Sequence, residues 1–193
     1  MSGPDLAWIN EANAALTRQT SQRLPQFSAD PEKARLARAT ARFELLEGGP
    51  IRELPSAIQR STTASIANFG SASAILNEAG GPQQCAQKMS NGLLWAARMP
   101  LTARLMPHGM VQQAAGSDEP GCEVRIVRYL TVVEAEDALQ YHYNQAIRAG
   151  LATEYFSGTQ ALLRAKGDDE ALMVEASSGP NGLQTITLVY WRK

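Results

Sequence analysis

The sequence has few of the residues from which most catalytic and metal sites are built. Its 193 residues include two histidines and two cysteines. It contains no His-Glu-x-x-His motif, no Gly-x-Ser-x-Gly motif and no glycine pattern of a nucleotide-binding loop. We therefore expect no catalytic residues, no metal and no cofactor. A non-catalytic role is favoured, and an enzyme is the third alternative.

Net charge is also low, at −1. Residues 1–100 carry ten Lys or Arg and eight Asp or Glu, which gives +2, whereas residues 101–193 carry eight and eleven, which gives −3. Neither half has the dense positive charge that binding to a phosphate backbone requires. We expect no nucleic-acid partner.

Long apolar runs are missing as well. The densest run is Leu93–Ala97, and Arg98 ends it, whereas a helix needs about 20 apolar residues to cross a bilayer. We expect no transmembrane segment. The opening residues Met1–Pro4 have neither the basic nor the apolar part of a secretory signal. We expect a periplasmic or otherwise exported protein whose signal was removed ahead of Met1–Pro4, whether or not these four residues are native; the cytoplasm is the alternative.

The two cysteines, Cys85 and Cys122, have 36 residues between them, which matches no zinc-binding or redox spacing. In an oxidising compartment they would form one disulfide bond. We expect this bond because both cysteines lie near predicted boundaries. The alternative is two separate buried thiols in a cytoplasmic protein.

Residues 1–100 are predicted to form a helical region of about four helices. Asp30 is a suitable N-cap and Pro31 a suitable first residue for one of them, and Gly48 ends it. Its large apolar residues recur at helical spacing, at Leu36, Ala39, Phe43 and Leu46. The other three helices are expected over about Asp5–Leu24, Glu53–Ala79 and Pro82–Arg98.

Residues 101–122 are predicted to be a linker and loop, with a polar loop over Gly116–Gly121. Residues 123–193 are predicted to form a β-α-β-β-β domain. Apolar and polar residues alternate over Glu123–Thr131, and acidic residues from Glu134 onward begin a helix that ends near Gly150. Three further strands are expected over Ala161–Lys166, Ala171–Ala176 and Leu183–Trp191. The expected fold class is α+β, with an antiparallel sheet covered by one helix.

This last part resembles small domains of unknown function in exported bacterial proteins and lipoproteins. The resemblance covers about 70 residues and is carried by the strand Glu123–Thr131, the acidic start of the helix at Glu134–Tyr143 and the helix end at Ala149-Gly150. Such domains often have Trp after the glycine, where this chain has Leu151. The resemblance implies location and shape more than activity.

Few side chains are candidates for a site. His142 lies on the apolar stripe of the predicted helix, so we expect it in the core, and His108 lies in a loop. Three arginines could bind an anion, but strand alternation places two of them on opposite faces, so at most two cooperate. These arginines are Arg125, Arg128 and Arg164.

The aromatic residues Tyr129 and Trp191 are the candidate contacts for a partner, because aromatic side chains dominate interface energetics. Trp191 could instead pack against the helical half. The leading hypothesis is a non-catalytic accessory or protein-interaction component of the bacterial cell envelope that presents a helical surface and a sheet edge to a protein partner. The alternative is a small-molecule or lipid-binding module with a pocket between helix and sheet or between the two halves. The oligomeric state is left open.

Overall fold

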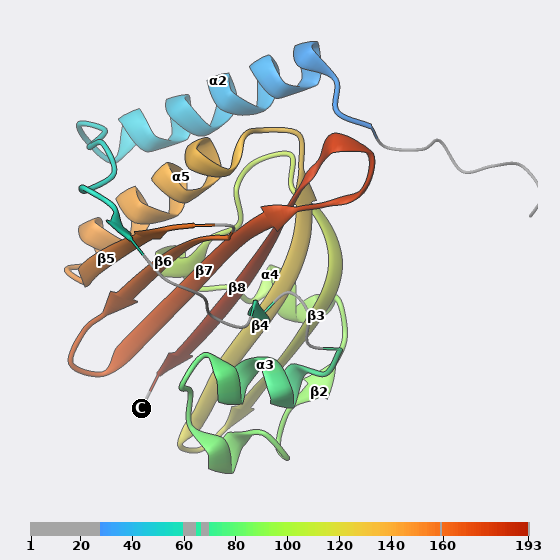
Figure 1. Ribbon diagram of the computed structural model, residues 1–193. Helices are drawn as coiled ribbons and strands as arrows, with labels where there is room; N and C mark the ends of the chain where they lie inside the picture. The colour runs from blue at the N-terminus through green and yellow to red at the C-terminus, as the bar shows by residue number, and fades with distance from the viewer. Residues whose placement is uncertain (1–27, 60–64, 67–69, 159, 193) are drawn as a thin grey trace, which may run out of the picture.

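The computed structural model describes residues 28–59, 65–66, 70–158 and 160–192. Within these residues the chain forms an eight-stranded sheet with helices on both faces (Figure 1), which confirms the α+β class. The helix expected over Asp5–Leu24 lies outside the described residues.

The strands follow the order β1-β5-β6-β7-β8-β4-β3-β2 across the sheet. All neighbours are antiparallel except β1 and β5, which are parallel, so the sheet is mixed where a purely antiparallel sheet is predicted. The strands are β1 Ile58–Gln59, β2 Ser90–Asn91, β3 Met110–Glu119, β4 Cys122–Thr131, β5 Ala152–Ser157, β6 Ala161–Lys166, β7 Glu170–Ser178 and β8 Gln184–Arg192.

The described residues contain four α-helices, and none of them is long and apolar enough to cross a membrane. Helices α2 and α5 are the long ones, whereas α3 and α4 have seven and four residues. The helices are α2 Pro31–Glu47, α3 Ala72–Glu78, α4 Leu94–Ala97 and α5 Ala135–Arg148.

The first half contains less helix than predicted. The helix expected over Glu53–Ala79 is wrong, because β1 lies in this range and α3 occupies only its last part. The hydroxyl of Ser71 accepts a hydrogen bond from the Ala74 N–H at 3.2 Å, so a serine that weakens a long helix instead begins a short one.

The helix expected over Pro82–Arg98 is also wrong. The range holds a 3-10 turn at Gln83–Cys85, the strand β2 and the short helix α4. Ser90 and Asn91 pair with β3 instead, and the Gly92 N–H donates to the Ala114 carbonyl at 2.9 Å. Hydrogen bonds to a distant strand therefore replace those of a local helix.

The polar loop expected over Gly116–Gly121 is mostly strand, since β3 continues to Glu119 and pairs with β4 through a turn at residues 120–121. Gly121 has a φ of +73°, a conformation that favours glycine. The polar residues of β3 misled the prediction because they lie on a strand next to the sheet edge, where side chains can reach solvent.

Helix α2 begins and ends as predicted, but its large apolar residues point outward. Its inward face is built of small residues, with Ala34, Ala37, Ala41 and Leu45 buried. By contrast, Leu36, Phe43 and Leu46 are 55%, 67% and 53% exposed. The alanines allow α2 to lie close on α5, as Figure 1 shows.

Two separate apolar clusters lie on the two faces of the sheet. Helix α5 covers one face and α2 packs on α5, whereas α3 lies on the opposite face (Figure 1). Side chains alternate between the clusters along each strand: Tyr190 is buried on the α5 face, and Trp191 packs on the α3 face. The α3 face also carries buried polar side chains, among them Glu175 of β7 and Thr187 of β8.

Candidate ligand-binding site

Four polar side chains form one row across the α3 face of the sheet, which we call the polar row. The strand register places Gln113 of β3 opposite Arg128 of β4, Arg128 opposite Thr187 of β8, and Thr187 opposite Glu175 of β7. Thr187 and Glu175 are 0% and 4% exposed. A buried charge is costly unless it is paired and hydrogen-bonded, so the charged side chains of this row need hydrogen-bond partners nearby.

Two charged side chains of the polar row, Glu175 and Arg128, bind residues 65–66 to this face of the sheet through hydrogen bonds. A carboxylate oxygen of Glu175 accepts from the Ser65 hydroxyl, and the other accepts from the Ile66 N–H at 3.1 Å. Arg128 Nη2 donates to the Ile66 carbonyl at 3.4 Å. Both backbone polar groups of Ile66 are therefore bound by charged side chains of the sheet.

Arg128 is only partly buried. Burial lowers the pKa of Arg128 from its ordinary value, and the nearby carboxylate of Glu175 opposes this shift. Its Nη1 donates to Gln113 Oε1 at 3.2 Å. The guanidinium is thus fixed by contacts on both sides, with Gln113 toward β3 and Ile66 toward β8.

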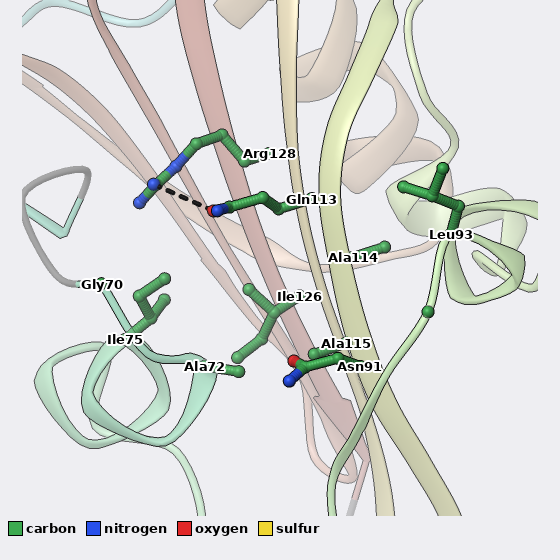
Figure 2. Close-up of a pocket in the computed structure, with 11 residues that line it drawn as sticks. Gly70, Ala72, Ile75, Asn91, Leu93, Gln113, Ala114, Ala115, Ile126 and Arg128 are labelled. Atoms are coloured by element: carbon green, nitrogen blue, oxygen red, sulfur yellow. Dashed lines mark hydrogen bonds between the residues drawn. The ribbon is translucent and has the colours of Figure 1, made fainter. Parts of the chain in front are cut away.

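A pocket of about 330 Å³ lies beside this row, between α3 and the sheet. Figure 2 shows Arg128 and Gln113 together at one end of it, joined by their hydrogen bond. The rest of its lining is mostly small or apolar and comes from α3, the β2–α4 segment, β3 and β4: Ala72, Ile75, Asn91, Leu93, Ala115 and Ile126. Among the described residues that line the pocket, Arg128 carries the only charged side chain.

A disulfide bond holds the α3 wall of the pocket. Cys85 and Cys122 are bonded, with their Cα atoms 5.4 Å apart, which confirms the predicted bond. Both are buried and share one apolar cluster with Ile75 and Leu76 of α3. The bond thereby joins the turn after α3 to the start of β4.

Trp95 packs on the α5 face of the sheet and anchors the segment that supplies the opposite wall of the pocket. Its ring lies 2.9 Å from the position that a Cβ on Gly116 would occupy, so it can approach β3 only because that residue is glycine. The ring also stacks under Arg125, with 4.8 Å between guanidinium and ring centroid, and its Nε1 donates to the Ser90 hydroxyl at 3.2 Å. Trp95 therefore fixes the β2–α4 segment, which supplies Leu93 to the pocket.

Of the three candidate arginines, Arg128 alone lines this pocket. Arg125 lies on the other face of the sheet, where it is 5% exposed and paired with Asp118. Arg164 lies on the same face as Arg128, but it stacks on Phe156 at 5.5 Å and lines a different pocket. The alternation argument thus separates Arg125 from Arg128 correctly.

The two candidate aromatic contacts do not lie together. Tyr129 is fully buried on the α5 face, whereas Trp191 is partly buried on the α3 face and lines the pocket beside Arg164. Tyr129 therefore contributes no surface in this structure. A partner contact at Trp191 stays a prediction.

His142 is a core residue, as predicted. It is 0% exposed, and its Nε2 lies 2.7 Å from the Tyr129 hydroxyl. Burial lowers the pKa of His142 to about 3, so its ring is neutral at pH 7.

His108 is exposed in a loop, with its Nε2 3.3 Å from the Thr40 hydroxyl. In the part of the chain that the structure describes, no three His, Cys, Asp or Glu side chains gather into a metal site.

Sequence reasoning named Arg128 and offered a pocket between helix and sheet, or between the two halves, as the alternative, but it missed Glu175 and the other residues that line the pocket. Glu175 stands alone within the apolar run Ala171–Ala176. A single carboxylate on the inward side of a buried strand indicates a polar partner across the sheet, and this signal could have found it. No comparable signal in the sequence indicates the lining of the pocket, which comes from separate segments between Gly70 and Arg128.

Comparison of the chain with protein-family models, with curated proteins and with solved structures finds no match.

Proposed function

We propose that this protein is a non-catalytic binding protein of the bacterial cell envelope whose pocket beside α3 takes a small ligand. The observation that carries the proposal is the pocket itself, which is apolar along most of its length and has Arg128 and Gln113 converging at one end. An apolar cavity with a few converging polar groups is the usual form of a small-molecule site, and about 330 Å³ lies at the small end of the range for such sites.

The cell envelope is proposed because of the disulfide bond. Cys85 and Cys122 are fully paired in the structure, and such bonds persist in oxidising compartments such as the bacterial periplasm. A non-catalytic role is supported because two buried titratable side chains already have partners inside the fold. His142 lies against the Tyr129 hydroxyl, and Glu175 accepts a hydrogen bond from the backbone N–H of residue 66.

Titration with small amphiphiles, followed by the backbone amide signals in NMR, tests the proposal. Octanoate, octan-1-ol and octylammonium share one apolar chain and differ in their polar end. We expect at least one of them to shift the amides of Ile75, Ala115 and Ile126 saturably. If none of the three does so, and neither 3-phenylpropanoate nor the N-acetylated dipeptide of alanine and leucine does so, the proposed pocket function fails.

A pocket-filling variant provides the matched control. Ala72 lines the pocket and is half-buried, so Ala72→Phe should place a ring in the cavity and abolish these shifts. Ala39→Phe makes the same change on the exposed side of α2 and should leave binding intact. Equal binding by both variants would show that the amphiphile sits elsewhere.

A second candidate function is that of a protein-interaction component of the envelope. It is favoured by Leu93, Leu94 and Leu101, which are 61%, 75% and 76% exposed; of these, Leu93 also lines the pocket. A photo-crosslinking amino acid at position 94 should give a discrete adduct in intact cells that is missing with the same group at Gln112, which is exposed on β3. Equal labelling from both positions would count against this function.

A further inference from the structure

The pocket beside α3 is strongly asymmetric. Ile75, Ala115 and Ile126 line one part of it, where Asn91 adds one neutral amide, and Arg128 with Gln113 lies at the other end (Figure 2). A ligand that fills it must bury an apolar body against the first group and present a hydrogen-bond acceptor to the second, because unpaired polar groups are costly where water is displaced.

The charge at the polar end is positive. Arg128 is the single charged side chain among the described lining residues. Glu175, the described carboxylate that acts on Arg128, lies in the opposite direction, since the strand order β7-β8-β4-β3 places Glu175 and Gln113 on opposite sides of Arg128. The Glu175 oxygens accept from Ser65 and Ile66, so this carboxylate faces the 65–66 segment.

The guanidinium is also held in place before any ligand arrives. Its Nη1 is bonded to Gln113 Oε1 at 3.2 Å and its Nη2 to the Ile66 carbonyl at 3.4 Å. A side chain that is already ordered loses less conformational entropy on binding. Partial burial further strengthens its attraction for an anion relative to a fully solvated arginine.

From this geometry we infer that the ligand is a small monocarboxylate with an apolar body, and that Arg128 and Gln113 recognise its carboxylate. The inference rests on the proposed function of the pocket. A carboxylate carries one negative charge, which one guanidinium balances and which its planar donors match. A phosphate monoester carries about −1.5 to −2 at pH 7 and would need further cations, which the described lining does not supply.

Affinities measured by isothermal titration calorimetry test the headgroup. We expect octanoate to bind at least tenfold more tightly than octan-1-ol, and octyl phosphate to gain nothing over octanoate. A second acid, 3-phenylpropanoate, covers the case of a compact aromatic body. Equal affinity for octanoate and octan-1-ol, or tighter binding of octyl phosphate, overturns the inference and leaves the pocket function standing. If none of these probes binds, and an N-acetylated dipeptide of alanine and leucine does not bind either, the pocket function itself fails.

Variants of the arginine test its role. Arg128→Gln should weaken octanoate at least tenfold and leave octan-1-ol unchanged, and Arg128→Lys, which keeps the charge but not the planar donors, should fall between. The matched control is Arg164→Gln, on the same face of the sheet but outside this pocket, which should alter neither affinity. Octanoate binding that survives Arg128→Gln would overturn the inference.

Gln113→Leu provides a second route if Arg128→Gln fails to fold. Gln113 is exposed on β3, so its replacement should be tolerated, and it removes the acceptor that orients Arg128. We expect octanoate to lose at least threefold in affinity while octan-1-ol does not.

The N-acetylated dipeptide of alanine and leucine, which has a free terminal carboxylate, distinguishes a peptide C-terminus from a free acid as the ligand. If this dipeptide binds and neither octanoate nor 3-phenylpropanoate does, the free-acid inference is wrong.

Discussion

Arg128 and Glu175 bind the two backbone polar groups of the same residue, although β8 lies between their strands. Arg128 donates to the Ile66 carbonyl at 3.4 Å, and Glu175 accepts the Ile66 N–H at 3.1 Å. Ile66 is 2% exposed and belongs to the apolar cluster of the α3 face. Two charged side chains of the sheet therefore fix a segment that covers it, and one of them also reaches the pocket.

Replacing Glu175 should destabilise the fold. In Glu175→Ala the Ile66 N–H and the Ser65 hydroxyl lose their acceptor, and Arg128 loses its nearby negative charge. Hydrogen bonds to a charged group contribute about 1.5–3 kcal/mol each, so we expect the free energy of unfolding to fall by about 2–4 kcal/mol. Urea unfolding at pH 7 measures this loss.

Two further substitutions make this prediction specific. Glu175→Gln keeps the shape and one acceptor, so it should cost less than Glu175→Ala. Glu154→Ala removes an exposed carboxylate from β5 and should change stability by less than about 0.5 kcal/mol. If Glu175→Ala behaves like Glu154→Ala, the polar row does not hold the 65–66 segment.

Loss of the disulfide bond should loosen the α3 side of the pocket. The bond joins residues 37 apart in sequence. On the chain-entropy account, closing a loop of this length stabilises the fold by about 4 kcal/mol. We expect Cys85→Ala combined with Cys122→Ala to lower the free energy of unfolding by about this amount and to weaken octanoate binding.

Thiol titration checks the bond itself. Protein denatured without reductant should show no free thiol, and two thiols should appear after reduction. Two free thiols before reduction in native material would remove the argument for export. A double-alanine variant as stable as the wild type would show that packing alone holds the 3-10 turn after α3.

Most of the second half of the fold could be predicted because its signals are local, but β5, Ala152–Ser157, was missed, so the helix is followed by four strands where three are predicted. In β6 and β7, a polar turn separates two apolar runs, and α5 begins with acidic residues and ends before Gly150, so nearest neighbours decide the structure. The first half depends on distant partners. Strand β1 has two residues and exists because β5 lies beside it, and β2 exists because β3 does. No local pattern in those dipeptides indicates a strand.

Helix α2 shows a second limit of the sequence argument. The spacing of Leu36 and Phe43 predicts an inward stripe, yet both face outward, and the alanines at positions 34, 37 and 41 are buried instead. Small side chains permit close approach of two helices, and this gain depends on the shape of the neighbour. The pocket likewise depends on segments that are distant in sequence. Strand alternation singles out Arg128, but Ile75 and Leu93, which line the pocket with it, come from separate segments.

Gly116 should not tolerate a side chain. A Cβ there would lie 2.6 Å from the Val124 carbonyl oxygen and 2.9 Å from the Trp95 ring. The first of these atoms is backbone in the paired strand, so the strand must shift. We expect Gly116→Ala to cost about 1–3 kcal/mol, as overpacking typically does, and to disturb the amide signals of the β2–α4 segment.

Gly92 is the matched position for this substitution. A Cβ on Gly92 would meet no atom within 4 Å, and the backbone there has no positive φ. Gly92→Ala should therefore be neutral or stabilise by up to about 1 kcal/mol through the unfolded chain. Thermal unfolding of both variants measures their stability. A similar loss of stability in Gly92→Ala and Gly116→Ala would contradict the role given to the close contact of Trp95 with β3.

Burial of His142 should make the fold acid-sensitive. Burial lowers its pKa to about 3, whereas in the unfolded chain the pKa is about 6.5. Between these two values the unfolded state binds a proton that the folded state does not, so stability falls as the pH drops below about 6.5. From pH 7 to pH 5 this one residue should cost the fold about 2 kcal/mol.

His142→Gln tests this dependence, because glutamine does not titrate and its oxygen can still accept from the Tyr129 hydroxyl. The variant should be less stable at pH 7, since it packs less well, yet lose about 2 kcal/mol less than the wild type between pH 7 and pH 5. Tyr129→Phe removes the hydroxyl but keeps the imidazole buried, and burial is the cause of the shift, so its pH dependence should stay that of the wild type. Equal slopes for the wild type and His142→Gln would mean that His142 titrates alike in both states, and the acid sensitivity would have to come from the carboxylates.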